Sequence, residues 1–359
     1  MFGKEKNGNE DLFMKRRNFI SAVGAVSASL LLPQENIFAE SSPKTIKPKR
    51  LKSGDTIGLV SPGGFITEEQ LEESKTNITS LGFSVIVARN ILKRYGYFAG
   101  TDRERAEDLH EMFGNKKVDG IVCVRGGYGC ARTLDFLDYD LIKRNPKILI
   151  GYSDITALLY GLYAETRLIG FHGPVATSTF NDFSVNNFKN VLMNPQSKLT
   201  LHSATEDSSK NEYKPFIIRH GKAKGKLVGG NLSIVASLIG TKYDIDTKGK
   251  IIFLEEVGEE PYRIDRMLTQ MIQAGKFKQA AGIALGVFTK CESKPDQSGI
   301  SNSFTLSEVL LERLFQLKIP VFYGLSFGHI VNKFTLPFGI NAELDVDNQS
   351  LTLLEKAVV

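Results

Sequence analysis

The sequence predicts an α/β protein with a parallel sheet in its N-terminal half and a smaller α/β domain after it. Short apolar runs alternate with helix-like segments from about residue 55 onward, which is the pattern of βαβ units. A polar segment rich in Ser, Asn, Asp and Lys interrupts this pattern near the middle of the chain. We therefore expect an N-terminal α/β domain over 53–176, a helix and interdomain linker over 177–222, and a C-terminal α/β domain over 223–359.

The composition excludes several classes of protein. Hydrophobic residues make up 42% and charged residues 24% of the chain, which is ordinary for a globular protein. The net charge of +5 is spread along the sequence without a basic run interleaved with aromatics, so we expect no nucleic-acid partner. The cysteines at 123, 130 and 291 are too scattered for a disulfide framework, and the five histidines lack zinc-ligand spacing. We expect no metal and no cofactor.

The N-terminal segment over 1–39 has the features of a signal peptide. The pair Arg16 and Arg17 precedes an apolar run over 19–32, which resembles a twin-arginine export signal. That run is too short for an ordinary transmembrane span, and Ala39 is a small residue at a suitable cleavage point. We therefore expect an exported, periplasmic protein that meets the membrane only during export.

The N-terminal domain is predicted element by element. A basic linker over 40–52 precedes the first strand, which ends in the turn Pro62-Gly63-Gly64. Apolar β-branched runs indicate strands, and the charged helix over 101–113 has Asp102 near its start and Gly114 after its end. In order, we expect helix 67–81, strand 83–87, helix 101–113, strand 118–124, strand 147–150, helix 155–165 and strand 168–171.

The C-terminal domain continues the alternation of helices and strands. Asn231 is a suitable N-cap for a helix that runs to Ile239. An apolar strand over 250–254 then ends in Glu255 and Glu256. In order, we next expect helix 262–274, strand 281–288, helix 306–314 and strand 320–323, followed by two alternating strands within 340–355.

One stretch, 118–137, combines a buried strand, a glycine turn and a helix that starts on Cys130. A cysteine at such a strand-to-helix corner would face the amides of a helix N-terminus, which stabilise a thiolate. This geometry is that of a nucleophile elbow, although the G-x-S-x-G pattern itself is not matched. A phosphate-binding glycine turn and a buried cysteine that fills a gap are the alternatives.

A hydrolytic nucleophile needs a general base and an acid that orients it. His172 and His329 each follow a short apolar strand and lie beside glycine, although a loop histidine more often has a structural role. Glu255 and Glu256 end a strand, where a salt bridge to an arginine of the next helix is the alternative role. These residues predict a cysteine hydrolase without naming its substrate.

Six sequence blocks occur in an order that resembles the murein LD-carboxypeptidase family, which also contains the microcin C immunity peptidases. The resemblance runs from about Lys49 to Leu354. The blocks are RGGYGC over 125–130, GYSDIT over 151–156, GGNL over 229–232, FLEE over 253–256, YRIDR over 262–266 and GH at 328–329.

The resemblance implies a Ser-Glu-His triad that removes a terminal D-amino acid from an L-to-D linkage. It places the nucleophile at Cys130, the base at His329 and the orienting carboxylate at Glu255, with Glu256 as the less favoured choice. It also implies an N-terminal domain akin to class I glutamine amidotransferases and a homodimer. The expected function is therefore an LD-carboxypeptidase that hydrolyses the terminal D-alanine from muropeptide stem tetrapeptides.

One departure from the family pattern concerns the nucleophile, because the family's usual serine is cysteine at position 130. Cys130 is a working thiol nucleophile in the favoured account. In a second account the chain is a non-catalytic or weakly active paralogue that binds muropeptides. In a third, Ser153 is the nucleophile, although its Tyr-Ser-Asp setting lacks the elbow glycines. An immunity-type hydrolase of peptidyl or aminoacyl nucleotides is the alternative activity.

Several residues are expected to contact the substrate. Backbone amides near Gly127 and Ala131 would hold the oxyanion. Arg125 or the turn Pro62-Gly63-Gly64 would bind the terminal carboxylate. Further candidate contacts are Asn231, Tyr97 and Tyr128.

Overall fold

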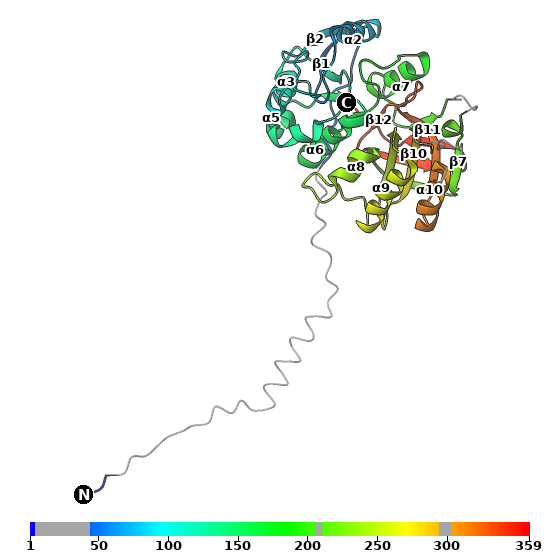
Figure 1. Ribbon diagram of the computed structural model, residues 1–359. Helices are drawn as coiled ribbons and strands as arrows, with labels where there is room; N and C mark the ends of the chain where they lie inside the picture. The colour runs from blue at the N-terminus through cyan, green and yellow to red at the C-terminus, as the bar shows by residue number, and fades with distance from the viewer. Residues whose placement is uncertain (4–43, 205–209, 294–302) are drawn as a thin grey trace. The chain divides into compact units, whose positions relative to one another are not determined.

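The computed structural model describes residues 1–3, 44–204, 210–293 and 303–359 (Figure 1). The chain divides into two units, Met1–Lys44 and Thr45–Val359, and every described helix and strand lies in the second. The predicted signal peptide and its cleavage point lie outside the described residues. Among the helices that are described, none is long and apolar enough to cross a membrane.

The first sheet has six strands in the order β12-β5-β4-β3-β1-β2. The strands β1 to β5 are parallel to their neighbours, and β12 joins β5 in the antiparallel direction. This arrangement confirms the predicted parallel N-terminal sheet. Its strands are β1 (Thr56–Val60), β2 (Ser84–Val87), β3 (Gly120–Cys123), β4 (Ile148–Ile150), β5 (Phe171–His172) and β12 (Leu336–Pro337).

The helices of the first half follow the sequence signals for helix starts. Thr67 and Thr101 each form a capping box with the residue three positions later, which satisfies amides that a helix start leaves without partners. The glycine turn leads into a helix shorter than the predicted one, because a 3₁₀ turn replaces its second half. The helices are α2 (Glu68–Ser80), α3 (Asp102–Gly114), α4 (Cys130–Thr133), α5 (Tyr139–Arg144) and α6 (Thr156–Thr166).

The second sheet has eight strands in the order β6-β14-β13-β8-β9-β10-β11-β7. Its central strands β8 to β11 are parallel, and antiparallel strands flank them on both sides. The predicted C-terminal α/β domain is thus confirmed as a mixed sheet. Its strands are β6 (Leu199–His202), β7 (Phe216–Arg219), β8 (Lys222–Asn231), β9 (Ile251–Val257), β10 (Gly282–Thr289), β11 (Val321–Gly328), β13 (Asn341–Asp345) and β14 (Ser350–Leu353).

The segment over 177–222 holds more structure than a helix and a linker. It contains α7 (Asp182–Leu192) and also supplies β6 and β7, the two edge strands of the second sheet. Both strands are short and lie at edges, so each buries only one side chain fully, Leu201 in β6 and Ile218 in β7. Such short runs give a weak sequence signal beside the polar residues around them.

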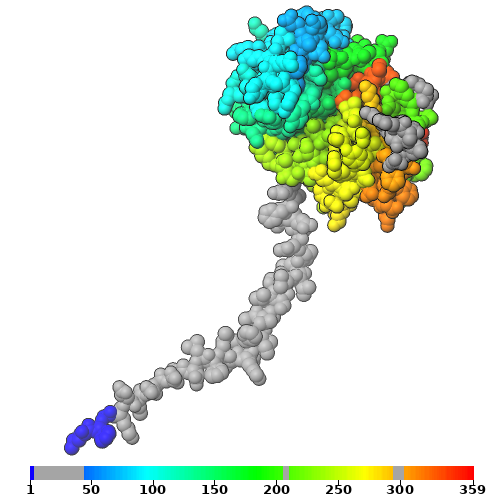
Figure 2. All heavy atoms as spheres, viewed as in Figure 1, coloured from blue at the N-terminus to red at the C-terminus, as the bar shows by residue number. Residues whose placement is uncertain are grey.

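The helices of the second half lie along the second sheet in Figure 1, with α8 (Leu232–Leu238), α9 (Pro261–Gln273) and α10 (Leu306–Leu314) in neighbouring positions. Helix α7 lies apart from these three helices in Figure 1. In Figure 2 its green residues border orange residues near position 330. Hydrogen bonds join these regions, from Asn181 to the Asn332 side chain (2.6 Å) and from Ser184 to the Val331 carbonyl (3.1 Å).

The two sheets are interlocked near the carboxyl ends of their parallel strands. Strand β12 comes late in the chain yet pairs with β5, where Leu336 lies opposite His172. The amide of Asn231, the last residue of β8, donates to the Thr156 hydroxyl at the start of α6 (3.0 Å). Because functional groups collect at the carboxyl ends of parallel strands, this junction is where a site is expected.

Candidate active site

A buried carboxylate holds a histidine at this junction. Glu255 lies in β9 and His329 directly follows β11, and the Nδ1 of His329 is 2.8 Å from the Oε2 of Glu255. The Glu255 side chain is fully buried, whereas that of His329 is 20% exposed. Burial alone would raise the pKa of Glu255, but the charge and hydrogen bond of His329, together with His172 and Asn231, outweigh burial and lower that pKa. The carboxylate thus fixes the proton on Nδ1 and leaves Nε2 able to accept one.

The residue before this histidine has to be glycine. Gly328 has a φ of +115°, a region that side chains rarely adopt, and a Cβ there would lie 3.1 Å from the Oε2 of Glu255. A larger residue would therefore push the carboxylate away from the imidazole.

The first sheet contributes Tyr152 and Ser153 to the same junction. The rings of Tyr152 and His329 are in edge-to-face contact with centroids 4.8 Å apart. Ser153 is the next residue and has a φ of +65°, an uncommon value for a residue with a side chain. It stands between the end of β4 and helix α6, at the first position of a 3₁₀ turn. A strained serine between a strand and a helix is the geometry of a nucleophile elbow.

The glycine turn after β3 packs directly against this serine. A Cβ placed on Gly126 would lie 3.0 Å from the Cβ and 3.2 Å from the Oγ of Ser153, so only glycine allows the approach. The same Cβ would lie 3.1 Å from the amide nitrogen of Asp154. Among the described residues, the amides of Asp154 and Gly127 have no hydrogen-bond acceptor. The free amide of Asp154 directly follows the serine, and the free amide of Gly127 follows the glycine that contacts it, so these two N–H groups are the candidates for an oxyanion hole.

Cys130 has a different environment from the one predicted. Its side chain is fully buried, and its amide donates to the Oδ2 of Asp154 (2.8 Å). Burial, followed by the nearby Asp154 carboxylate, raises the pKa of the Cys130 thiol well above its usual value. The prediction of a stabilised thiolate is therefore wrong, because a carboxylate occupies the helix amide that was to stabilise it. The structure agrees with the alternative of a buried cysteine that fills a gap.

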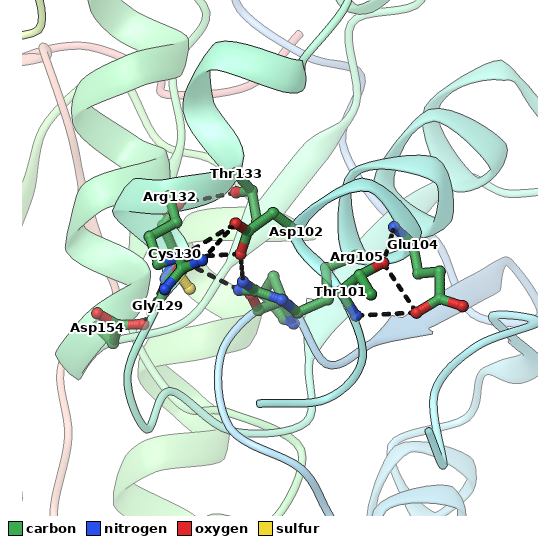
Figure 3. A network of polar contacts seen from close by, with 10 residues as sticks. Thr101, Asp102, Glu104, Arg105, Gly129, Cys130, Arg132, Thr133 and Asp154 are labelled. Atoms are coloured by element: carbon green, nitrogen blue, oxygen red, sulfur yellow. Dashed lines mark hydrogen bonds and ion pairs between the residues drawn. The ribbon is translucent and has the colours of Figure 1, made fainter. Parts of the chain in front are cut away.

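A network of charged residues lies behind the glycine turns, as Figure 3 shows. The fully buried guanidinium of Arg105 donates to the carbonyls of Pro62 and Gly129 and pairs with Asp102. Asp102 also binds the more exposed Arg132 (2.8 Å). Arg105 therefore ties the turn after β1 to the turn after β3. The sequence analysis missed this residue, since an arginine in a charged helix is indistinguishable from a solvated one by its spacing.

Several predicted substrate contacts line one pocket of about 500 Å³. Arg125, Gly127 and Tyr128 contribute from the glycine turn. The guanidinium of Arg125 has one hydrogen bond to a described residue, a long one to the Phe65 carbonyl (3.4 Å), so donors remain for a ligand. The pocket is lined by Gly64, Phe65, Tyr97, Arg125, Gly127 and Tyr128.

Comparison with known proteins agrees with this geometry. Residues 57–173 match the model of the LD-carboxypeptidase N-terminal domain, and residues 224–344 match that of the LD-carboxypeptidase C-terminal domain. The chain belongs to the LD-carboxypeptidase family.

Relatives in this family cover most of the chain. A probable murein peptide carboxypeptidase of Bacillus subtilis is 35% identical over 308 residues, which are 86% of this chain and 94% of that protein. The murein tetrapeptide carboxypeptidase of Pseudomonas aeruginosa is 30% identical over 295 residues, or 80% and 92% of the two chains. The solved structure of the microcin C7 self-immunity protein MccF in its wild-type apo state has a TM-score of 0.79 at 28% identity and covers 88% of this chain and 100% of that one.

Two further predicted residues of this LD-carboxypeptidase homologue have other partners. Asn231 donates from its side chain to the Oε1 of Glu256 (2.9 Å) and accepts the amide of Ile234 (3.3 Å), so both ends of its amide are engaged within the protein. Glu256 also accepts from the amide and hydroxyl of Ser233. Ala131 is exposed on α4 and directly follows the buried Cys130. Its amide was expected to bind the oxyanion because Cys130 was the expected nucleophile, so this role no longer follows.

His172, the other histidine singled out by sequence, lies behind the pair of Glu255 and His329. It is fully buried, and neither ring nitrogen has a hydrogen-bond partner among the described residues. Burial lowers the pKa of His172 to about 4, so the imidazole is neutral at physiological pH. Its ring packs against Phe253 with centroids 5.4 Å apart. Within the described part of the chain, no three His, Cys, Asp or Glu residues are grouped as a metal site would need.

Proposed function

We propose that this LD-carboxypeptidase homologue removes the terminal D-alanine from muropeptide stem tetrapeptides, with Ser153 as its nucleophile. The observation that supports it is the strained Ser153 next to Tyr152, whose ring touches the His329 held by Glu255. The names of the relatives from Bacillus subtilis and Pseudomonas aeruginosa support the substrate class. This assignment replaces Cys130 as the nucleophile.

The proposed reaction is acyl transfer to serine. The Nε2 of His329 takes the proton of the Ser153 hydroxyl while Glu255 stabilises the imidazolium through Nδ1. The serine oxygen attacks the carbonyl of the residue before D-alanine, and the amides of Asp154 and Gly127 bind the oxyanion. Collapse of this intermediate expels D-alanine, which takes its proton from His329. Water then hydrolyses the acyl-enzyme by the same base.

A carboxypeptidase has to recognise the free carboxylate of its substrate. Arg125 suits this role because it is half-buried in the pocket beside the glycine turn and has donors to spare. A guanidinium binds a carboxylate through two parallel hydrogen bonds, which would also fix the position of the scissile bond. Recognition of the carboxylate then restricts cleavage to the last residue of the peptide.

The test is mass spectrometry of purified protein incubated with a disaccharide tetrapeptide. We expect the loss of one alanine from the wild-type reaction and no loss with Ser153→Ala. A stem pentapeptide, which ends in a D-D bond, should remain intact as the control for bond specificity. Measurable binding of an unchanged tetrapeptide would make the protein a muropeptide binder instead, and cleavage of an aminoacyl sulfamoyl adenosine alone would favour the immunity-type activity.

A further inference from the structure

Two tyrosines beside the pocket expose most of their surface. Tyr97 is 61% and Tyr128 is 57% exposed, and their ring centroids are 5.7 Å apart. Both line the pocket of about 500 Å³ that includes Arg125. Exposed aromatic rings grouped at the mouth of a pocket commonly mark a binding surface.

The protein holds these two rings in place from behind. The buried ring of Phe98 stacks on Tyr128 at an interplanar angle of 27° and contacts Tyr97 with centroids 4.4 Å apart. The guanidinium groups of Arg105 and Arg132 each lie 4.8 Å from the Phe98 ring centre. Both arginines are fixed by Asp102 (Figure 3). Rings that are ordered before a ligand arrives lose little conformational freedom on binding, which favours affinity.

The position of the rings relates them to the proposed nucleophile. Gly126 packs against Ser153, and Tyr128 is two residues further along the chain. The Cα atoms of Gly126 and Tyr128 are therefore at most about 7 Å apart. In a stem tetrapeptide, three residues separate the sugar from the scissile bond, a span of about 10 Å when extended. With the scissile bond at Ser153 and the carboxylate at Arg125, the substrate reaches the two tyrosines with its sugar when its stem turns back across the same pocket, and a stem of three residues is long enough for that turn.

The angle between the rings distinguishes a sugar from a nucleobase. The planes of Tyr97 and Tyr128 meet at 52°, so they do not form the parallel slot in which a flat base stacks on both sides. A puckered pyranose has an apolar face of C–H groups that can contact two tilted rings at once. Its hydroxyl and N-acetyl groups would remain at the polar rim, where the phenolic oxygens of both tyrosines can bond to them.

We propose that Tyr97 and Tyr128 form a carbohydrate subsite that binds the N-acetylhexosamine attached to the stem peptide. This inference rests on the proposed LD-carboxypeptidase activity and adds a preference for substrates that still carry their glycan. The subsite contributes binding energy at a distance from the reacting bond. It therefore raises kcat/KM for the glycosylated substrate and leaves kcat/KM for the free peptide unchanged.

The test compares a disaccharide tetrapeptide with the free tetrapeptide. We expect the ratio of their kcat/KM values to exceed one in wild type and to fall by roughly three- to tenfold in Tyr97→Ala and in Tyr128→Ala. Tyr97→Phe should keep most of the preference. Tyr95→Ala is the matched control, because Tyr95 is also 60% exposed on the same loop but does not line the pocket.

The outcomes separate the two proposals. Cleavage of both substrates with an unchanged ratio in the two alanine variants would overturn the subsite and leave the proposed function standing. If neither substrate is cleaved, the ratio of the two Kd values measured by calorimetry tests the subsite independently of turnover. A change from dimer to monomer in Tyr97→Ala with no change in the ratio would instead assign the rings to contact with a second copy of the chain.

Discussion

Substitution of Ser153 separates the two candidate nucleophiles and tests the backbone strain at the same time. Ser153→Ala and Ser153→Gly both remove the hydroxyl, and loss of a serine nucleophile costs about 10⁶-fold in kcat in a well-studied serine protease. Cys130→Ala removes a thiol that is fully buried against Asp154. We expect this variant to keep its activity within about tenfold, because a small change behind the site costs only about 1 kcal/mol.

The strain predicts an unusual order of stability for the two inactive variants. Ser153 has a φ of +65°, and a left-handed conformation costs a residue with a Cβ about 1–2 kcal/mol. Glycine has no such cost there but is about 0.5–1 kcal/mol less favourable than alanine through its unfolded-state entropy. Ser153→Gly should therefore be more stable than Ser153→Ala by up to about 1.5 kcal/mol, the reverse of the usual preference.

The assays are release of D-alanine for activity and urea unfolding for stability. A fluorophosphonate probe should label wild type at the peptide that contains Ser153, and a thiol reagent should leave Cys130 unmodified in the folded protein. Full activity in Ser153→Ala would refute the assignment of the nucleophile. A Ser153→Gly variant that is less stable than Ser153→Ala would refute the argument from strain while leaving the catalytic role intact.

Three further predictions concern other parts of the chain. Burial lowers the pKa of His172 to about 4 in the folded protein, whereas an unfolded histidine has a pKa of about 6.5. The unfolded state therefore binds a proton that the folded state does not, and wild type should lose stability as the pH falls from about 6.5 to about 4. At pH 5 this loss is about 2 kcal/mol by linkage, and His172→Phe should lose correspondingly less in urea unfolding at pH 7 and pH 5. Glu255→Gln should lower kcat by about 10⁴-fold with the fold intact by circular dichroism, since an amide does not hold the required tautomer of His329; a loss below tenfold would contradict that role. Residues 1–39 fused to a folded reporter should direct it to the periplasm, and lysines at Arg16 and Arg17 should abolish this in cell fractionation.

The sequence was sufficient to predict the two α/β halves and the histidine–carboxylate pair. Strand runs, helix caps and glycine stops are local signals, and α10 begins and ends at the predicted residues Leu306 and Leu314. Glu255 and Glu256 were singled out because a carboxylate at the end of an apolar strand is unusual. The family resemblance then selected Glu255 and His329 from the open alternatives, and the structure pairs these two residues. The edge strands β6 and β7 were missed, because their pairing depends on partners far along the chain.

The proposed nucleophile was difficult to predict because its distinguishing property is a backbone angle. Glycines made the turn before Cys130 resemble an elbow, whereas the positive φ belongs to Ser153, a residue type that gives no sequence sign of it. Arg105 was difficult to predict for a similar reason, because its burial depends on hydrogen bonds to carbonyls of two separate turns. The backbone conformation of Ser153 and the burial of Arg105 thus depend on tertiary contacts, which residue spacing within one helix or strand does not reveal.

Division of the proposed triad between two sheets makes the junction of the sheets part of the catalytic machinery. Ser153 follows a strand of the first sheet, while Glu255 and His329 belong to the second, so the distance from serine to histidine depends on how the sheets are joined. That junction is fixed by β12, which crosses to pair with β5, and by the edge-to-face contact of Tyr152 with His329. Because strand pairing is rigid compared with a hinge, the three residues of the proposed triad are held in fixed positions relative to one another. The glycine turns carry the proposed substrate-binding groups, and the buried Arg105 fixes these turns against the same sheet.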